Sequence, residues 1–245
     1  MTTSPLQAQR MKYKPKLPGV LRGAPSKIVL KKGAATKAAN KAAEIKKLFP
    51  NMYGEPALSF RTAQKPDRVP ATNVGVILSG GQAPGGHNVI AGIFDVLKGL
   101  NKNSKLYGFL GGPSGLIDGE YVEITKTLID KYRNTGGFDI IGSGRTKLET
   151  PEQFDAALEN CRKLDIAGLV VIGGDDSNTN ACVMAEYFAA NEAGVQVVGC
   201  PKTIDGDLKN AGIETSFGFD TATKVYGELI GNILRDALSA KKYYH

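Results

Sequence analysis

The sequence predicts an α/β fold: a doubly wound, mostly parallel sheet with helices on both faces. Short runs rich in Val, Ile and Leu recur along the chain, each run ends in Gly, Ser or Pro, and helical patterns fill the intervals. Strands buried on both faces read as continuous apolar runs, and parallel strands need crossover helices. We therefore expect strands at 73–79, 105–111, 138–144, 167–174 and 195–201.

Helices are expected at 87–102 and 150–165, and an amphipathic helix begins the last segment, 225–245. Thr150 is followed three residues later by Gln153, a spacing typical of a capping box at a helix start. In a doubly wound sheet, ligands bind beyond the carboxyl ends of the strands. The loops that follow the predicted strands are therefore the places to look for chemistry.

The first 72 residues are expected to form a basic N-terminal extension in front of an α/β domain at 73–245. Residues 1–32 are rich in Pro and Lys and predict an extended arm. Residues 33–49 contain strong helix formers with a thin apolar stripe, which predicts a helix laid on another surface. Residues 50–72 predict a Pro-rich connector.

The net charge of +7 is unevenly divided along the chain. Residues 1–50 hold 12 of the 31 basic residues and one of the 24 acidic ones, so the arm carries +11 and the remainder −4. A nucleic-acid partner is not expected, because that needs basic and aromatic side chains clustered on the folded body. Lys-rich termini are usually solvated, and a nucleic-acid or membrane role for the arm is the alternative. An acid-free start also occurs in organelle transit peptides, which favour Arg and Ser over Lys.

Cysteine usage predicts a cytoplasmic protein. Cys161, Cys182 and Cys200 stand far apart without CxxC spacing, and the chain has two histidines. This pattern disfavours a disulfide framework or a zinc site and favours reduced, buried thiols. No apolar run approaches the length of a membrane span, so no membrane partner is expected.

Two post-strand loops have the composition of an anion-binding site. The 79–86 loop, SGGQAPGG, has glycines that let the backbone approach a phosphate, but it lacks the Lys-Ser/Thr of a P-loop NTPase. The 142–147 loop, GSGRTK, places Arg145 and Lys147 where the oxygens of an oligoanion could be met. A solvated charge pair is the alternative for these two residues.

The 173–180 loop, GGDDSNTN, raises the question of why a phosphate loop should carry two adjacent carboxylates. Asp175 follows the glycine turn and is placed to bind Mg²⁺, which prefers a carboxylate plus water and substrate phosphates. The alternative is an aspartate that caps the following helix, but two aspartates exceed that need.

The 201–207 loop, PKTIDGD, carries the sharpest signal. Asp205 and Asp207 are two residues apart, with Lys202 upstream. A carboxylate can take the proton of an attacking hydroxyl, and a lysine can neutralise charge on the group being transferred. A solvated polar turn is the alternative.

Five segments in this order resemble the phosphofructokinase family, and within it the pyrophosphate-dependent branch: SGGQAPGG (79–86), GGPSGL (111–116), GSGR (142–145), GGDDSNT (173–179) and PKTIDGD (201–207). The resemblance covers about 73–245, and residues 1–72 resemble the N-terminal extension of long family members. It implies reversible transfer of a phosphoryl group from pyrophosphate to the 1-hydroxyl of D-fructose 6-phosphate in glycolysis and gluconeogenesis, with Mg²⁺.

The resemblance also implies a role for each matching residue. On the donor side, Gly80 would lie against the phosphoryl donor, Asp175 would bind the metal, and Arg145 would bridge donor and transition-state oxygens. The further candidate substrate-binding residues are Gly81, Lys147, Asp176 and Ser177. On the acceptor side, Asp205 would be the base, Asp207 would support it, Thr203 and Ile204 would line the sugar site, and Lys202 would stabilise the transferring charge.

Asp176 and Lys202 stand where ATP-using relatives have glycine, which answers the question of the paired carboxylates. A carboxylate at 176 would fill the space of a nucleotide α-phosphate and repel it. Like charges ~4 Å apart at an effective dielectric of ~20 cost about 4 kcal/mol, near a thousandfold in binding.

Family members continue well past residue 245, so the chain is expected to be the donor-binding half of such an enzyme. A truncated polypeptide, a split gene product or an open reading frame cut short would each give this result. Lys242 and Tyr243 fall where family residues reach sugar phosphate across a subunit boundary. A homo- or hetero-oligomer, or a companion chain that supplies the other half, is expected. The alternatives are a non-catalytic regulatory or assembly subunit and an ATP-dependent 6-phosphofructokinase.

Overall fold

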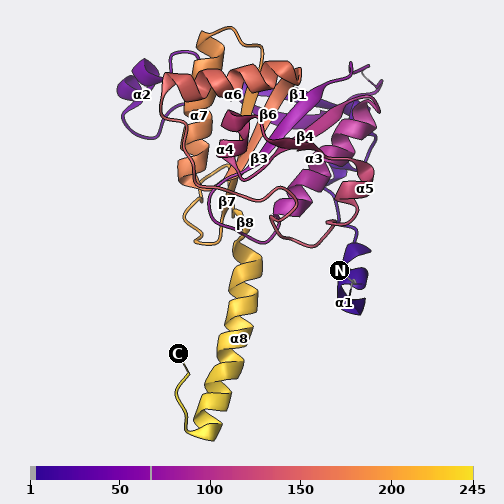
Figure 1. Ribbon diagram of the computed structural model, residues 1–245, viewed down its shortest axis with the longest axis vertical. Helices are drawn as coiled ribbons and strands as arrows, with labels where there is room; N and C mark the ends of the chain where they lie inside the picture. Colours follow the sequence, from indigo (N-terminus) through magenta and orange to yellow (C-terminus); the bar gives the residue numbers. More distant parts are fainter. Residues whose placement is uncertain (1–3, 67, 245) are drawn as a thin grey trace.

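The computed structural model describes residues 4–66 and 68–244 and is built around a mostly parallel six-stranded sheet (Figure 1). Its strands, in spatial order, are β5 (Tyr121–Glu123), β4 (Lys105–Phe109), β3 (Asn73–Leu78), β6 (Ile166–Gly173), β7 (Gln196–Thr203) and β8 (Phe217–Gly218). Only the edge pair of β4 and β5 is antiparallel among the described pairs of this sheet. The predicted doubly wound α/β fold is confirmed.

Helices cover both faces of this sheet. On one face lie α4 (Pro113–Asp118), α6 (Pro151–Lys163) and α7 (Asp175–Ala190); on the other lie α3 (Gly86–Leu100) and α5 (Lys126–Ile129). Successive side chains of a strand point to opposite faces. Accordingly, Ile77 of β3 packs in the core with α6 and α7, whereas Val76 and Leu78 pack in the core with α3. The capping box of α6 is present: the Thr150 N–H donates to Gln153 Oε1 at 3.2 Å.

The strand expected at 138–144 is absent; that expectation is wrong. The segment forms turns, with Gly142 in a positive-φ conformation and its N–H donating to the carbonyl of Phe138. Phe138, Ile140 and Ile141 are buried as side chains that pack under the sheet face beside α3. These side chains produce an apolar run without strand pairing, because burial alone does not require a ladder of hydrogen bonds. The segment makes a single parallel bridge, Ser79 to Gly144.

The N-terminal extension is more structured than the sequence predicts. Residues 1–32 are not a simple extended arm: in the described part they contain α1 (Pro5–Met11), two 3₁₀ turns (Gly19–Leu21 and Pro25–Lys27) and the start of β1 (Ile28–Ala35). The 33–49 helix is reduced to α2 (Ala42–Leu48), and the 50–72 connector contains β2 (Pro56–Thr62). β1 and β2 form an antiparallel pair of mostly exposed residues. The stretch Leu58 to Arg61 of β2 does alternate between apolar and polar side chains, but β1 does not, so the pairing of these strands was not predicted.

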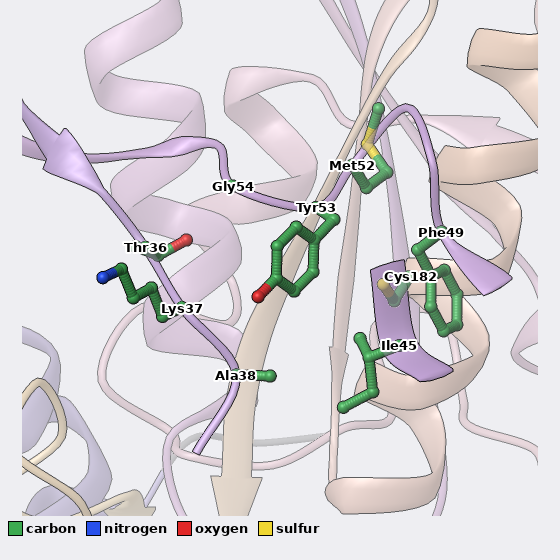
Figure 2. Close-up of a pocket in the computed structure, with 9 residues that line it drawn as sticks. All are labelled: Thr36, Lys37, Ala38, Ile45, Phe49, Met52, Tyr53, Gly54 and Cys182. Atoms are coloured by element: carbon green, nitrogen blue, oxygen red, sulfur yellow. The ribbon is translucent and has the colours of Figure 1, made fainter. Parts of the chain in front are cut away.

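Glu186 of α7 fixes part of this extension to the domain. Its carboxylate accepts hydrogen bonds from the N–H of Asn51, the N–H of Met52 and the side-chain amide of Asn51. Residues of the extension between Thr36 and Gly54, together with Cys182 of α7, line a mainly apolar pocket of about 250 Å³ (Figure 2). Cys161 is buried, Cys200 is partly buried and Cys182 is exposed, so the expectation of buried thiols holds for Cys161 and is wrong for Cys182.

The last helix, α8 (Phe219–Ala240), projects away from the body of the molecule (Figure 1). It begins six residues before the predicted start, and Ala222 is its only buried residue in the described chain. Among the described residues, no helix is long and apolar enough to cross a membrane.

Candidate active site

The candidate site lies where the chain reverses its direction of winding. β3 and β6 are adjacent parallel strands; the chain runs outward from β3 to β4 and returns to the other side of β3 as β6. In open α/β sheets the crevice at such a switch point is the usual ligand site. The loops at 79–86 and 173–180 therefore leave the sheet side by side, and the Ser177 hydroxyl donates to Ser79 Oγ at 2.8 Å.

Glycines allow these loops to approach each other closely. Gly80 has φ +81°, a conformation that side chains rarely adopt. A Cβ at this position would lie 3.5 Å from Ser177 Oγ and 4.0 Å from Lys202 Nζ. A Cβ at Gly173 would lie 2.3 Å from the Cβ of Ser177. A larger residue at 173 would therefore prevent the first turn of α7 from packing against the end of β6.

A cavity of about 220 Å³ opens between these loops. It is lined by Ser79, Gly80, Arg145, Thr146, Lys147, Asp176, Ser177 and Asn180. Five of these were predicted as site residues from the sequence; Ser79, Thr146 and Asn180 were not. Asn180 carries a signal in the sequence, because it lies four residues after Asp176 and therefore on the same face of a helix that starts at Asp175.

Lys202 connects the end of β7 to this cavity. The residue is only 5% exposed, and its ammonium group donates to the carbonyl of Gly81. Burial, together with the nearby positive charge of Arg145, lowers the pKa of Lys202, and the negative charge of Asp205 acts in the opposite direction. A Cβ at Gly81 would lie 3.4 Å from Arg145 Nη2. Arg145, Lys202 and the glycine backbone of the first loop thus converge on one place.

Lys147 and Asp176 form an ion pair at the mouth of the cavity, with 3.2 Å between Nζ and Oδ2. Both side chains are about half exposed or more. The second aspartate of the paired carboxylates is therefore partnered within the chain, whereas Asp175 is exposed at the first position of α7. Negative charge in the first turn of a helix also interacts favourably with the helix dipole.

The remaining residues of the PKTIDGD loop lie beside Lys202. Thr203 is buried, and its hydroxyl accepts the N–H of Asp205 at 3.1 Å. Asp205 and Asp207 are exposed on either side of Gly206. Ile204 lines a second, broader cleft of about 820 Å³, which is shared with Ala222, Val225 and Tyr226 of α8.

Two predicted site residues are not brought near the loops at the end of the sheet. Lys242 and Tyr243 follow the far end of α8, well away from the sheet edge (Figure 1), and Tyr243 is 92% exposed. The expectation that they reach a site in another subunit stays a prediction.

Comparison with known proteins agrees with this geometry. The phosphofructokinase family model matches residues 73–244. The chain belongs to the phosphofructokinase family. The matched segment begins at β3 and contains every loop of the candidate site.

Relatives in the family are much longer than this chain. A pyrophosphate–fructose 6-phosphate 1-phosphotransferase from Porphyromonas gingivalis is 62% identical over 245 residues, which is 100% of this chain and 44% of that protein. The enzyme of the same name from Treponema pallidum is 52% identical over 254 aligned positions, again 100% of this chain and 44% of that protein. The chain therefore spans less than half the length of these relatives.

Solved structures show the same fold. Saccharomyces cerevisiae phosphofructokinase superimposes with a TM-score of 0.59 at 22% identity and covers 69% of this chain and 22% of that one. Pichia pastoris phosphofructokinase gives a TM-score of 0.50 at 27% identity, covering 63% and 17% of the two chains.

Proposed function

We propose that this chain is the donor-binding part of a pyrophosphate-dependent phosphofructokinase. In this proposal residues 73–245 form the phosphoryl-donor domain and residues 1–72 an extension docked on it. The reaction moves a phosphoryl group from pyrophosphate to the 1-hydroxyl of D-fructose 6-phosphate. The observation that carries the proposal is the convergence of Arg145, Lys202 and the Gly80–Gly81 backbone beside the carboxylate of Asp205.

The donor side is suited to a compact, highly charged anion. Arg145 and Lys202 supply positive charge, Ser177 supplies a hydroxyl, and Gly80 and Gly81 leave the backbone uncovered. Lys147 adds a further positive charge at the mouth. Phosphoryl transfer depends mainly on positioning and charge neutralisation, so a rigid cationic cavity is the principal requirement.

The residues present fit a Mg²⁺ ion that is shared with the donor. No group of three or more His, Cys, Asp or Glu side chains forms a metal cluster in the part of the chain that is described. Mg²⁺ often binds through one or two carboxylates and completes its shell with water and substrate phosphates. Asp175 is the carboxylate that would hold it. When bound, the ion would neutralise charge on the diphosphate oxygens.

On the acceptor side, Asp205 is the proposed base. It takes the proton of the sugar 1-hydroxyl as that oxygen attacks the nearer phosphorus of pyrophosphate, and inorganic phosphate leaves. The N–H···Oγ1 bond to Thr203 fixes the turn that carries Asp205. Asp207 supports the same centre, while Thr203 and Ile204 form the wall towards the sugar.

Asp176 is proposed to set the choice of donor. With its Lys147 partner it occupies the mouth of the cavity, where an α-phosphate of a nucleotide would extend. Pyrophosphate is shorter and stops before it. Because Lys147 neutralises part of the charge, we attribute the exclusion to the space filled by the pair as well as to repulsion.

The proposed enzyme also needs chain segments that lie beyond this chain. The chain spans 44% of its Porphyromonas relative, and α8 leaves a long apolar face uncovered in the described chain. We propose that a C-terminal segment, in the same or a companion polypeptide, packs there, and that Lys242 and Tyr243 reach sugar phosphate across a boundary within an oligomer. Relatives named as beta subunits, such as that of Solanum tuberosum at 54% identity, favour an oligomer. A cytoplasmic location suits these soluble substrates.

The test is turnover of fructose 6-phosphate with Mg²⁺ and either pyrophosphate or ATP. It is run with this chain alone and after addition of the C-terminal segment of the Porphyromonas relative. Turnover with pyrophosphate in either mixture supports the proposal, and turnover with ATP alone would favour the ATP-dependent alternative. A complex that forms and turns over neither donor would favour a non-catalytic subunit, a role consistent with the 45% identical relative named subunit alpha 1.

A further inference from the structure

Asn180 joins the cavity loop to α7 through two hydrogen bonds. The N–H of Leu148 donates to Asn180 Oδ1 at 3.1 Å, and Asn180 Nδ2 donates to the carbonyl of Leu148 at 2.8 Å. The Asn180 amide thus makes hydrogen bonds with both the N–H and the carbonyl of Leu148, as a neighbouring β-strand would do. The side chain of Leu148 is only 2% exposed and packs in the core beside α6 and α7, so this end of the loop is fixed.

The other end of the same loop is fixed at Gly144. Its carbonyl accepts the N–H of Gly80 at 2.8 Å, next to the Ser79–Gly144 bridge. Between Gly144 and Leu148 lie Arg145, Thr146 and Lys147, which are all exposed and all line the 220 Å³ cavity. The loop is therefore a short span with two anchors, and its three central side chains face the proposed donor.

The ion pair between Lys147 and Asp176 does not by itself hold this span. Both side chains are largely open to solvent, and exposed ion pairs contribute typically less than about 1 kcal/mol. Asp176 and Asn180 are four residues apart on one face of α7, so they meet adjacent residues of the loop, Lys147 and Leu148. The less exposed contact at Leu148 therefore sets the register that lets the exposed contact form.

We propose that Asn180 is a positioning residue that holds Arg145 and Lys147 where their side chains can contact a bound diphosphate. The proposal rests on the proposed function, because it names pyrophosphate as the anion they meet. Asn180 itself does not need to touch the donor. Its removal leaves the Leu148 end of the span held by the buried Leu148 side chain alone, so both cationic side chains are held less firmly relative to Gly81 and Ser177.

The first test measures how readily the span from Gly144 to Leu148 opens when no donor is present. Trypsin cuts after Arg145 and Lys147, and cleavage of a locally opened segment follows the population of the open state. We expect Asn180→Ala to raise the cleavage rate at these two bonds roughly tenfold, since two hydrogen bonds to buried backbone are lost. Asn180→Asp keeps the shape and the acceptor for the Leu148 N–H but loses the donor, and we expect an intermediate rate.

Asn191→Ala is the matched control. Asn191 follows the same helix and its amide also donates to a backbone carbonyl, that of Tyr187 at 2.8 Å, but it is remote from the cavity. We expect its cleavage rate to equal that of the wild type. Equal rates in all variants, or equal acceleration in the control, would overturn the positioning role. If Asn180→Ala does not fold, as judged by circular dichroism, Asn180→Asp decides the question.

The second test measures pyrophosphate binding by calorimetry with Mg²⁺ present. We expect the Kd of Asn180→Ala to rise about tenfold, with Asn191→Ala unchanged. Wild-type binding that Asn180→Ala leaves unaltered would overturn this inference while the proposed function stands. A wild-type chain that binds no pyrophosphate would overturn the proposed function, and with it the donor role of Asn180, even if the cleavage rates change as expected.

Discussion

The helices α7 and α8 each follow a loop of the candidate site, yet they are packed very differently. α7 lies on the sheet beside β7 and buries Ala181, Met184 and Phe188 in the core. α8 is longer and strongly amphipathic, but Ala222 is its only buried residue in the described chain. Its exposed large apolar side chains are Val225, Tyr226, Leu229, Ile230, Ile233, Leu234 and Leu238.

This difference separates the two sides of the proposed reaction. The donor cavity is built from loops that are anchored on the core: Ser177 to Ser79, Leu148 to Asn180, and Lys202 to Gly81. The acceptor side faces the broad cleft next to α8, whose walls include Ile204 and Tyr226. Under the proposed function, the chain would therefore supply a fixed donor site and one open wall of an acceptor site.

The largest expected effect separates chemistry from donor binding. In a mixture that turns over pyrophosphate, Asp205→Asn removes the base and should lower kcat by about a hundred- to ten-thousandfold. Pyrophosphate binding should be unchanged or tighter, because a negative charge near Lys202 is lost. Steady-state kinetics measures the loss of kcat, and calorimetry on the same protein measures pyrophosphate binding. A parallel loss of binding and turnover would show that Asp205 belongs to the donor side.

Equivalent truncations in the two helices should have unequal effects on stability. Phe188 of α7 is fully buried, so Phe188→Ala should lower the free energy of unfolding by about 3–5 kcal/mol. Leu234 of α8 is 56% exposed, and Leu234→Ala should change it by less than about 0.5 kcal/mol. Urea denaturation of this chain measures both. A cost for Leu234→Ala that approaches that of Phe188→Ala would mean that α8 is already covered in solution.

The donor side can be probed for specificity at Asp176. In the turnover mixture, Asp176→Gly should raise the ATP-to-pyrophosphate ratio of kcat/KM by roughly ten- to a hundredfold. This is less than the about 4 kcal/mol expected for unpaired like charges, because Lys147 neutralises part of the charge. Competition assays with both donors give the ratio. An unchanged ratio would remove Asp176 from donor selection.

The smallest expected effect is the pH dependence of pyrophosphate binding. The lowered pKa of Lys202 means that its ammonium loses its proton below pH 10.5, the ordinary value. Affinity should therefore decrease as the pH rises through that lowered pKa, by at most about tenfold per pH unit for one proton. Calorimetry with Lys202→Met should show weaker binding without this decrease.

The same lysine gives a check on stability. Because the pKa of Lys202 is lowered by burial, its charged ammonium group reduces the free energy of unfolding at neutral pH. This destabilisation diminishes as the pH rises from the lowered pKa to 10.5. Lys202→Met should therefore be more stable than the wild type at neutral pH, with the difference shrinking in alkali. Greater stability of the wild type at neutral pH would contradict the assignment of burial as the cause.

The sequence by itself determined four of the six strands of the sheet (β3, β4, β6 and β7), the helices α3 and α6, and the loops that carry the candidate site. Local patterns suffice for these features: continuous apolar runs specify buried strands, and Thr150 with Gln153 specifies a helix start. Five of the residues that line the donor cavity could be named in advance because glycines, cations and carboxylates gather after strands. Asp176 could be named, but its pairing with Lys147 could not.

Tertiary structure alone decided the contacts between distant segments. The run at 138–144 is as apolar as a strand, yet it packs as side chains beside α3, because nothing local distinguishes burial from pairing. β1 and β2 form strands because they pair with each other, although a long segment separates them in the sequence. Asn180 acquires its place because the fold brings Leu148 to it, and the apolar face of α8 stays uncovered because nothing in the described chain packs against it. In each case the deciding energy comes from a partner remote in sequence, which no local pattern encodes.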